Sequence, residues 1–442
     1  MKVYATDQIR NVVLLGHGGA GKTTLAEAMC LLSGITTRMG KVEDGNSVSD
    51  YTKEEQKRGF SIKTSLIPIE WKGCKINILD TPGYFDFVGE VEEAISVADA
   101  AVIVVSGKAG VEVGAERAWD LYEKYNIPRM FYISDMDLEH TSYPNTDDPL
   151  KELYGPKIVP FNFAIEEGGK HVGAVNVISQ KGFKWGPKDA SECPVPDDCA
   201  DNLETYREAL METVAETNEE FMERYFGGDE FTVEEIADAV TANIPACSVG
   251  PVECGASTQC FGVYTVLDDI VSYLPAPSAR KVAGKNMKSG EEFVAAFDDA
   301  QAKSAFIFKT IVDPFIGRYS LIKIRSGVFK TDETVYDSSL ESEMRLGKLY
   351  IMVGNKTSEI AELHAGDIGA VAKLGDAKTG DTLSTKAEPI EYPQMDISTP
   401  YTYIRYNAKN KNDIEKIAPC AIPTASAAMS RRPSFSRIFI WP

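Results

Sequence analysis

Residues 11–24 read NVVLLGHGGAGKTT, and this stretch decides the fold of the first half of the chain. The apolar run 11–15 predicts a buried strand, and the apolar spacing over 22–32 predicts a helix. The turn between them, residues 16–23, matches the pattern GxxxxGKS/T, in which consecutive backbone N–H groups surround a phosphate at a helix N-terminus. We therefore expect the Lys22 ammonium to reach the β- and γ-phosphates and the Thr23 hydroxyl to bind Mg²⁺.

The alternation of strand and helix continues beyond this turn. An apolar strand at 76–79 ends in Asp80, and further elements of the same style are predicted at 88–96 (helix), 101–105 (strand), 113–125 (helix), 130–134 (strand) and 251–274 (strand, then helix). This pattern favours a doubly wound α/β fold with a parallel sheet, whose ligands bind at the carboxyl ends of the strands.

The sequence Asp80-Thr81-Pro82-Gly83 stands where a second metal-holding carboxylate is expected. Asp80 is predicted to hold Mg²⁺ through water, and the Gly83 N–H to contact the γ-phosphate. The charged segment 50–62, DYTKEEQKRGFSI, taken alone reads equally well as a solvated helix. Its place between the two phosphate motifs favours a switch segment, in which Ser61 offers an oxygen to Mg²⁺ when the γ-phosphate is present.

Composition excludes several classes of function. A formal charge of −20 and a pI near 4.8 disfavour nonspecific binding to nucleic acid, DNA included, because phosphate neutralisation needs clustered Lys and Arg. No stretch approaches the ~18 to 20 apolar residues that cross a bilayer, and residues 1–10 lack a secretory signal, so a cytoplasmic protein without membrane contact is expected. The eight cysteines and four histidines show no metal-ligand spacing.

The chain divides into four predicted parts. Residues 1–278 form the α/β domain, with an insertion at about 138–250 that is first Gly/Pro-rich and then acidic and helical. Residues 279–395 show short strands with turn signals, typical of an antiparallel β-barrel. Residues 396–417 follow, and the family resemblance given below implies that they are the stub of a third domain. Residues 418–442 have no acidic residue and are expected to be a disordered tail; that this tail is an out-of-frame ending is a hypothesis.

The succession GHGGAGKTT, EEQKRGFSI, DTPGYFDFVGEVEEAISVADAAVIVVSGKAGVEVGAERAW, IPRMFYISDMD and CGASTQCFGVYTVLDDIVSYLPAP resembles the elongation factor G family. AFIFKTIVDPFIGRYSLIKIRSGVFKTDETVY is similar to the second-domain barrel of that family, so the resemblance covers about residues 8–417. It implies a GTPase that binds GTP or GDP with Mg²⁺ and acts with the ribosome. Gly317 and Arg318 then occupy the barrel loop that approaches ribosomal RNA. A monomer is expected.

Motifs and resemblance together give the candidate site. Catalysis is assigned to Tyr84 and Lys22, and metal binding to Thr23, Ser61 and Asp80. The predicted nucleotide-binding residues are Gly16, His17, Gly18, Gly19, Ala20, Gly21, Lys22, Thr23, Thr24, Asp80, Gly83, Ser134, Asp135, Asp137, Ala256 and Ser257.

The sequence departs from the family pattern on the phosphate side. The family has a histidine after DTPG, which positions the attacking water, and this chain has Tyr84. A phenol can donate or accept a hydrogen bond, but it does not supply an imidazolium charge near neutral pH, so weak hydrolysis is expected. Gly19 replaces the family's aspartate in the glycine-rich turn, which removes a charge beside the phosphates.

The guanine-reading motif NKxD of the family appears here as Ser134-Asp135-Met136-Asp137. Asp137 can still accept hydrogen bonds from guanine N1 and the exocyclic amine. Asp135 lacks the lysine stem that lies over the base and adds a negative charge, unless neighbouring residues compensate the substitution. Gly255-Ala256-Ser257 replaces the order GSA, whose contribution is largely one backbone N–H.

Three readings of function stay open from the sequence. The first is an elongation-factor-G-like GTPase impaired by truncation after the second domain, without the translocation that needs the missing domains. The second is a nonproductive nucleotide- or ribosome-binding fragment without turnover. The third is the front half of a relative of the tetracycline ribosomal protection proteins.

The altered base motif generates a direct test. Asp135→Lys should tighten GDP binding by roughly ten- to a hundredfold, because a lysine stem and ammonium replace a negative charge beside the nucleotide. Calorimetric titration of both proteins with GDP measures the change. An unchanged dissociation constant would mean that neighbouring residues compensate for Asp135.

Overall fold

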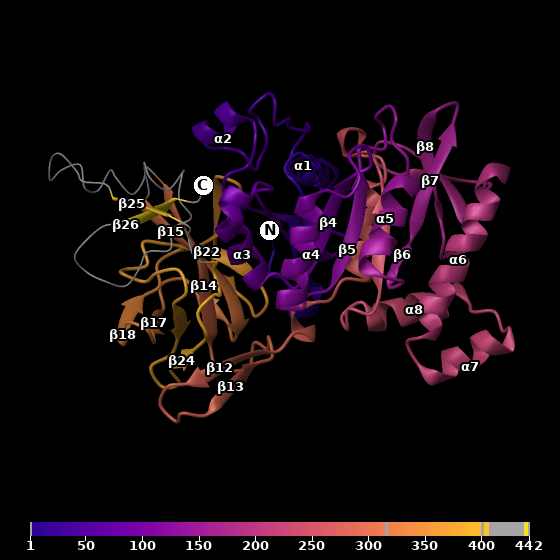
Figure 1. Cartoon of the computed structure of the whole chain (residues 1–442). Helices are drawn as coiled ribbons and strands as arrows, with labels where there is room; N and C mark the ends of the chain where they lie inside the picture. The colour runs from indigo at the N-terminus through magenta and orange to yellow at the C-terminus, as the bar shows by residue number, and fades with distance from the viewer. Residues whose placement is uncertain (1, 314–316, 399–401, 406–436, 441–442) are drawn as a thin grey trace.

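The computed structural model describes residues 2–313, 317–398, 402–405 and 437–440. Figure 1 shows an α/β domain in the centre, an antiparallel β domain on one side of it and the inserted strands and helices on the other. The predicted class, a doubly wound α/β domain with an insertion followed by an antiparallel β domain, is confirmed. No helix in the described ranges combines the length and apolar character needed to cross a bilayer.

The α/β domain is built on a seven-stranded sheet. Its order is β2 (Ser65–Trp71), β3 (Cys74–Asp80), β1 (Ile9–Leu15), β4 (Ala100–Ser106), β5 (Arg129–Ser134), β11 (Gly250–Cys254) and β6 (Ile158–Pro160). All neighbours are parallel except β2, which pairs antiparallel with β3. Because β1 lies between β3 and β4, the strand order reverses beside it, and such a switch point is where ligands of doubly wound sheets bind.

Helices cover both faces of this sheet. Helix α1 (Lys22–Leu32) packs against α9 (Val263–Ser272), while α3 (Val88–Val97) and α4 (Val113–Tyr125) contact each other and β1. The charged segment 50–62 contains a helix, α2 (Lys53–Arg58), which begins with a capping box between Thr52 and Glu55 and ends at Gly59. The helical reading of this segment is therefore correct, and it does not conflict with a switch role.

The inserted region between β5 and β11 lies at the end of the molecule away from the second domain (Figure 1). Its strand β6 extends the main sheet, so the part that leaves the main sheet begins after it. Before β6 the insertion holds one α-helix, and after β6 it holds a four-stranded antiparallel sheet and three α-helices. The elements are α5 (Pro144–Tyr154), β7 (Asn162–Glu167), β8 (Lys170–Asn176), β9 (Lys181–Trp185), β10 (Ala190–Cys193), α6 (Ala200–Ala215), α7 (Glu219–Gly227) and α8 (Val233–Asn243).

The second domain has an eight-stranded antiparallel sheet around its own apolar core, which includes Ile307, Ile322 and Leu349. In spatial order its strands are β18 (Ser342–Arg345), β17 (Thr334–Asp337), β23 (Thr382–Ser384), β14 (Ser304–Asp313), β15 (Gly317–Ser326), β22 (Ile368–Ala372), β19 (Leu349–Val353) and β20 (Lys356–Ile360). Smaller sheets add β12 (Val282–Asn286), β13 (Glu292–Ala295), β24 (Ile390–Glu391), β16 (Phe329–Lys330) and β21 (Glu362–Leu363). Short 3-10 helices are η1 (Thr6–Gln8), η2 (Phe85–Phe87), η3 (Asp197–Cys199), η4 (Ser257–Gln259) and η5 (Pro277–Ala279).

Buried ion pairs join the two domains. Lys75 of β3 lies 2.7 Å from Asp367, which precedes β22, and Lys323 of β15 lies 2.5 Å from Asp99, which precedes β4. Burial outweighs the Asp99 charge and lowers the pKa of Lys323 to about 8. A buried pair loses much of its Coulomb energy to desolvation, but removing one partner leaves an uncompensated charge, so these pairs fix how the domains meet.

The predicted third-domain stub and disordered tail lie largely outside the described residues. Within them, β25 (Thr402–Arg405) pairs antiparallel with β26 (Arg437–Ile440). The division of the chain at 278, 395 and 417 stays a prediction.

A buried acid in the main sheet gives a pH-dependent test. Glu253 of β11 is fully buried, accepts a hydrogen bond from Asn162 and faces Asp269, so burial, reinforced by Asp269, raises its pKa well above the usual value. The folded state then holds a proton that the unfolded state releases, and stability falls as pH rises above about 4.5.

Glu253→Gln removes this titration. The difference in free energy of unfolding, Glu253→Gln minus parent, should therefore rise by up to about 1.4 kcal/mol for each pH unit between pH 5 and pH 7. Urea denaturation at both pH values measures it. A difference that does not change with pH would contradict the assignment.

Candidate nucleotide site

Three glycines give the loop after β1 its shape. Gly16, Gly19 and Gly21 have φ of 137°, 91° and 95°, a region that side chains other than glycine rarely adopt. A Cβ on Gly16 would lie 2.3 Å from the Val104 carbonyl oxygen, so the loop passes directly over β4. The loop then enters α1 at Lys22, which leaves the first N–H groups of that helix facing the loop.

The Lys22 side chain lies along this loop. Its Nζ donates to the carbonyls of Gly16 at 2.9 Å and His17 at 2.7 Å. Burial lowers the pKa of Lys22 to about 8, although nearby Asp80 favours the charged form. The Lys22 ammonium therefore lies against the glycine-rich loop, where it is hydrogen-bonded to two neutral carbonyls.

An oxygen cluster lies at the start of α1. The Thr23 hydroxyl donates to Asp80 Oδ2 at 2.9 Å and lies 3.2 Å from Ser61 Oγ. Asp80 Oδ1 makes no hydrogen bond to any described residue, and burial raises the pKa of this carboxyl. Buried Asp50 faces the same cluster, and burial together with Asp80 raises its pKa to about 7. Carboxylate and hydroxyl oxygens with an unsatisfied buried atom are a donor set that fits Mg²⁺.

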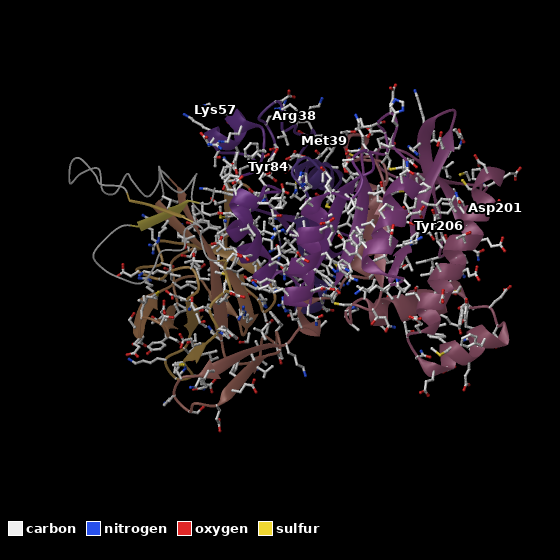
Figure 2. The ribbon with its side chains drawn as sticks, in the orientation of Figure 1. Arg38, Met39, Lys57, Tyr84, Asp201 and Tyr206 are labelled. Carbon is white, nitrogen blue, oxygen red and sulfur yellow. The ribbon has the colours of Figure 1, made fainter. Side chains whose placement is uncertain are left out.

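Gly83 and Tyr84 pack against the glycine-rich loop at Gly18. A Cβ on Gly83 would lie 2.6 Å from the Gly18 nitrogen, so glycine is required where the two loops meet. The Tyr84 ring lies over Gly18 and packs on Phe60 with centroids 4.7 Å apart, and its side chain is 42% exposed. Figure 2 shows Tyr84 at the same edge of the molecule as Arg38, Met39 and Lys57, far from Asp201 and Tyr206 of the insertion.

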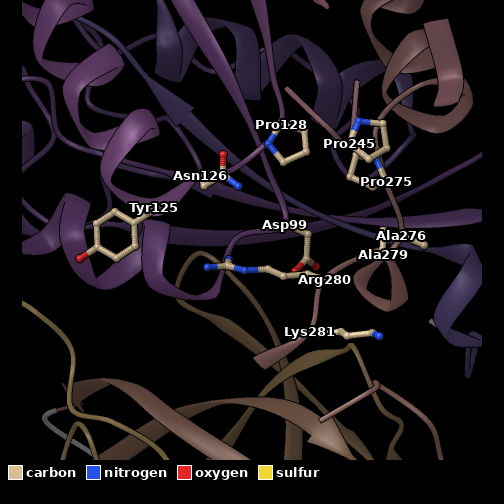
Figure 3. Close-up of a pocket in the computed structure, with 10 residues that line it drawn as sticks. All are labelled: Asp99, Tyr125, Asn126, Pro128, Pro245, Pro275, Ala276, Ala279, Arg280 and Lys281. Carbon is tan, nitrogen blue, oxygen red and sulfur yellow. The ribbon is translucent and has the colours of Figure 1, made fainter. Parts of the chain in front are cut away.

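One cavity of about 160 Å³ gathers the phosphate-side residues. Ser61 and Tyr84 line it opposite the glycine-rich loop, and the predicted residues that surround it are Gly18, Gly19, Gly21, Lys22, Thr23, Thr24, Ser61, Gly83 and Tyr84. A larger cavity of about 400 Å³ lies at the opposite edge of the sheet, where the strands begin (Figure 3). The linker residues Arg280 and Lys281 line it, and none of the predicted site residues does.

The base-side residues form a second group beyond the phosphate cavity. Ser134 Oγ donates to the Ala20 carbonyl at 2.8 Å, which ties β5 to the glycine-rich loop. Asp137 Oδ2 accepts from Thr258 at 2.6 Å and Gln259 at 3.1 Å, so this carboxylate faces the loop after β11.

Asp135 turns away from that group. It has a φ of 63° and accepts a hydrogen bond from Ser106 at 2.6 Å, and burial raises its pKa. The Ala256 N–H donates to the Phe261 carbonyl at 2.9 Å, which leaves Ser257 as the residue whose N–H can serve a base.

Comparison with known proteins decides the family. The elongation factor Tu GTP binding domain family matches residues 7–276. The chain belongs to this GTPase family. Elongation factor G domain 2 matches residues 302–386, so the two domains together are those of an elongation-factor-G-like translational GTPase.

A solved relative agrees with this assignment. A crystal structure of a protein from Thermus thermophilus superposes with a TM-score of 0.82 at 31% sequence identity, over 94% of this chain. This chain spans 60% of the length of that protein.

Two buried acids near the candidate site, Asp50 and Glu27, are not among the residues predicted from the sequence. Asp50 was seen only as the first residue of the switch segment, although an acid before a charged helix is a weak signal for a metal site. Glu27 of α1 is buried and accepts the Gly40 N–H at 2.9 Å and the Val48 N–H, and it thereby holds the chain that leads into the switch segment against α1. Glu27 is a buried acid on an otherwise apolar helix face, which was the available signal.

The Ser134 hydroxyl provides a test of the base side. Ser134→Ala should weaken nucleotide binding by roughly fivefold, because the lost hydrogen bond, worth about 1 kcal/mol, loosens the glycine-rich loop. Ser338→Ala is the matched control, since Ser338 makes a similar buried bond to the Ile390 carbonyl in the second domain. Calorimetry with GDP compares them, and equal affinities in the two variants would show that Ser134 does not support the loop.

Proposed function

We propose that this GTPase binds GTP with Mg²⁺, hydrolyses it slowly and acts with the ribosome. The observation that carries the proposal is the oxygen cluster of Thr23, Ser61 and Asp80 beside the Lys22 ammonium, under a loop whose glycines expose backbone N–H groups. Phosphate on one side and a divalent cation on the other are the ligands that such a cavity suits.

Thr23, Ser61 and Asp80 would hold Mg²⁺, with Asp50 facing them. When bound, the ion neutralises charge on the β- and γ-phosphate oxygens. The raised pKa values of Asp50 and Asp80 reflect carboxyls buried close together with little compensating charge. A cation among them would favour their ionised forms.

Other residues would act on the nucleotide directly. Lys22 would exchange the Gly16 and His17 carbonyls for phosphate oxygens, and Gly83 would donate its N–H to the γ-phosphate. The Tyr84 hydroxyl would orient the attacking water, a weaker role than that of a histidine because a neutral phenol brings no positive charge. The Asp137 carboxylate would accept from the N1–H and the 2-amino group of guanine, neither of which adenine has.

The ribosomal contact is proposed for the second domain. Gly317 is exposed at the start of β15, beside residues that lie outside the described ranges. The Arg318 guanidinium donates to the Gly375 and Ala377 carbonyls, which braces this end of the domain. A braced arginine at an exposed hairpin end suits a local contact to RNA in an otherwise acidic protein.

The second candidate is nucleotide or ribosome binding without turnover. Tyr84 in place of histidine and Asp135 in place of lysine favour it, because each weakens one requirement of the GTPase cycle. The front half of a tetracycline-type ribosomal protection protein remains a third candidate, since it would share the same two domains.

Nucleotide titration separates these candidates. We expect calorimetry to show Mg²⁺-dependent preference for GTP over ATP, and turnover by the parent above that of Lys22→Ala, which loses the phosphate-binding ammonium. Turnover is measured with and without ribosomes. Binding with turnover equal to Lys22→Ala would favour the second candidate, and equal affinity for GTP and ATP would refute the base assignment.

A further inference from the structure

One lysine of the second domain reaches into the α/β domain beside the candidate site. Lys309 of β14 is buried between Glu90 and Glu93 of α3, with its Nζ 3.2 Å from Glu93 and in contact with Glu90. Burial alone would lower the pKa of Lys309, but the two carboxylates outweigh it and raise the pKa. The lysine therefore carries a full charge inside the domain interface.

Glu90 links this lysine to the switch segment. Its carboxylate also accepts the Thr64 N–H at 2.8 Å, and its backbone carbonyl accepts the Thr64 hydroxyl at 2.8 Å. Thr64 lies three residues after Ser61, the candidate metal ligand. The Glu90 carboxylate thus joins Lys309 of the second domain to Thr64, which lies two residues after the switch segment.

The position of α3 sets the position of Tyr84. The helix begins at Val88, and only the short η2 separates it from Tyr84 and Gly83. Gly83 has no room to move toward Gly18, because a Cβ there would already lie 2.6 Å from the Gly18 nitrogen. A displacement of the first turn of α3 would therefore move Tyr84 relative to the phosphate cavity.

We propose that Lys309 is a positioning residue for hydrolysis, which holds the first turn of α3, and through it Tyr84, in the arrangement needed for attack on the nucleotide. The inference rests on the proposed hydrolysis. It makes the second domain part of the hydrolytic apparatus, although no residue of that domain lines the phosphate cavity in the described ranges.

The test compares two buried interdomain lysines in the full chain. Lys309→Met removes the contact to α3, while Lys75→Met removes the pair with Asp367 and serves as a matched control. Lys309→Met leaves the Glu90 and Glu93 carboxylates without their lysine, and Lys75→Met leaves Asp367 without its lysine, so both should lower the melting temperature. Only Lys309→Met should lower the single-turnover rate of GTP hydrolysis, by about ten- to a hundredfold, as expected for a misplaced reacting group.

Four further readouts separate positioning from loss of fold. The dissociation constant for GDP should be unchanged in Lys309→Met, and Lys309→Arg should recover most of the rate. Glu90→Gln keeps an acceptor for Thr64 and should lose part of the rate in the same direction. Hydrogen exchange of residues 83–92, measured without nucleotide, should become faster in Lys309→Met and stay unchanged in Lys75→Met.

A turnover loss of equal size in both lysine variants would overturn the proposal and indicate general weakening of the interface. If the parent hydrolyses no GTP, the proposed hydrolysis fails, and the exchange of residues 83–92 decides the anchoring by itself. Equal exchange in the parent and Lys309→Met would then refute it.

Discussion

The close passage of the loop after β1 over the Val104 carbonyl is the constraint on which the rest of the structure depends. Only glycine fits at position 16, so the chain turns there and delivers Lys22 to the first position of α1. The register of the sheet pairs Leu14 with Asp80, which places this carboxylate level with the end of β1. The contact between Thr23 and Asp80 follows from these two facts, because one residue starts the helix and the other ends the neighbouring strand.

Three buried ionisable groups lie close to this loop, and their neighbours neutralise their charges only in part. Lys22 has a lowered pKa while Asp50 and Asp80 have raised ones, and burial is the largest cause in each case. These groups are therefore held in surroundings that disfavour their charged forms. Ligands that bring both a cation and an anion would relieve both effects together, which is the electrostatic reason to expect the metal and the phosphate to bind as a unit.

The sequence predicted the α/β elements well where local signals agree. The ranges 22–32 and 113–125 match α1 and α4, because apolar periodicity and the neighbouring turn residues point to the same limits. The predicted phosphate-side residues that line one cavity belong largely to a contiguous motif, which a sequence displays directly. The contacts on the base side were harder to predict from the sequence. The hydrogen bond of Ser134 to Ala20 and that of Asp137 with Thr258 each join residues more than a hundred positions apart. The contact of Lys309 with Glu90 was the least predictable from the sequence. Nothing in the strand of Lys309 indicates a partner 219 positions earlier in the chain.

The fold thus treats the two ends of the candidate site differently. On the phosphate side, the contiguous glycine-rich loop shapes the cavity, and Gly19 lies at a φ of 91° that residues other than glycine rarely adopt. On the base side, side chains carry the contacts that hold the predicted residues. Ser106 donates to Asp135 and Ser134 reaches the loop that the missing lysine would have touched. These hydrogen bonds give Asp135 and Ser134 partners within the protein, and neither of them supplies the stem or the charge of a lysine.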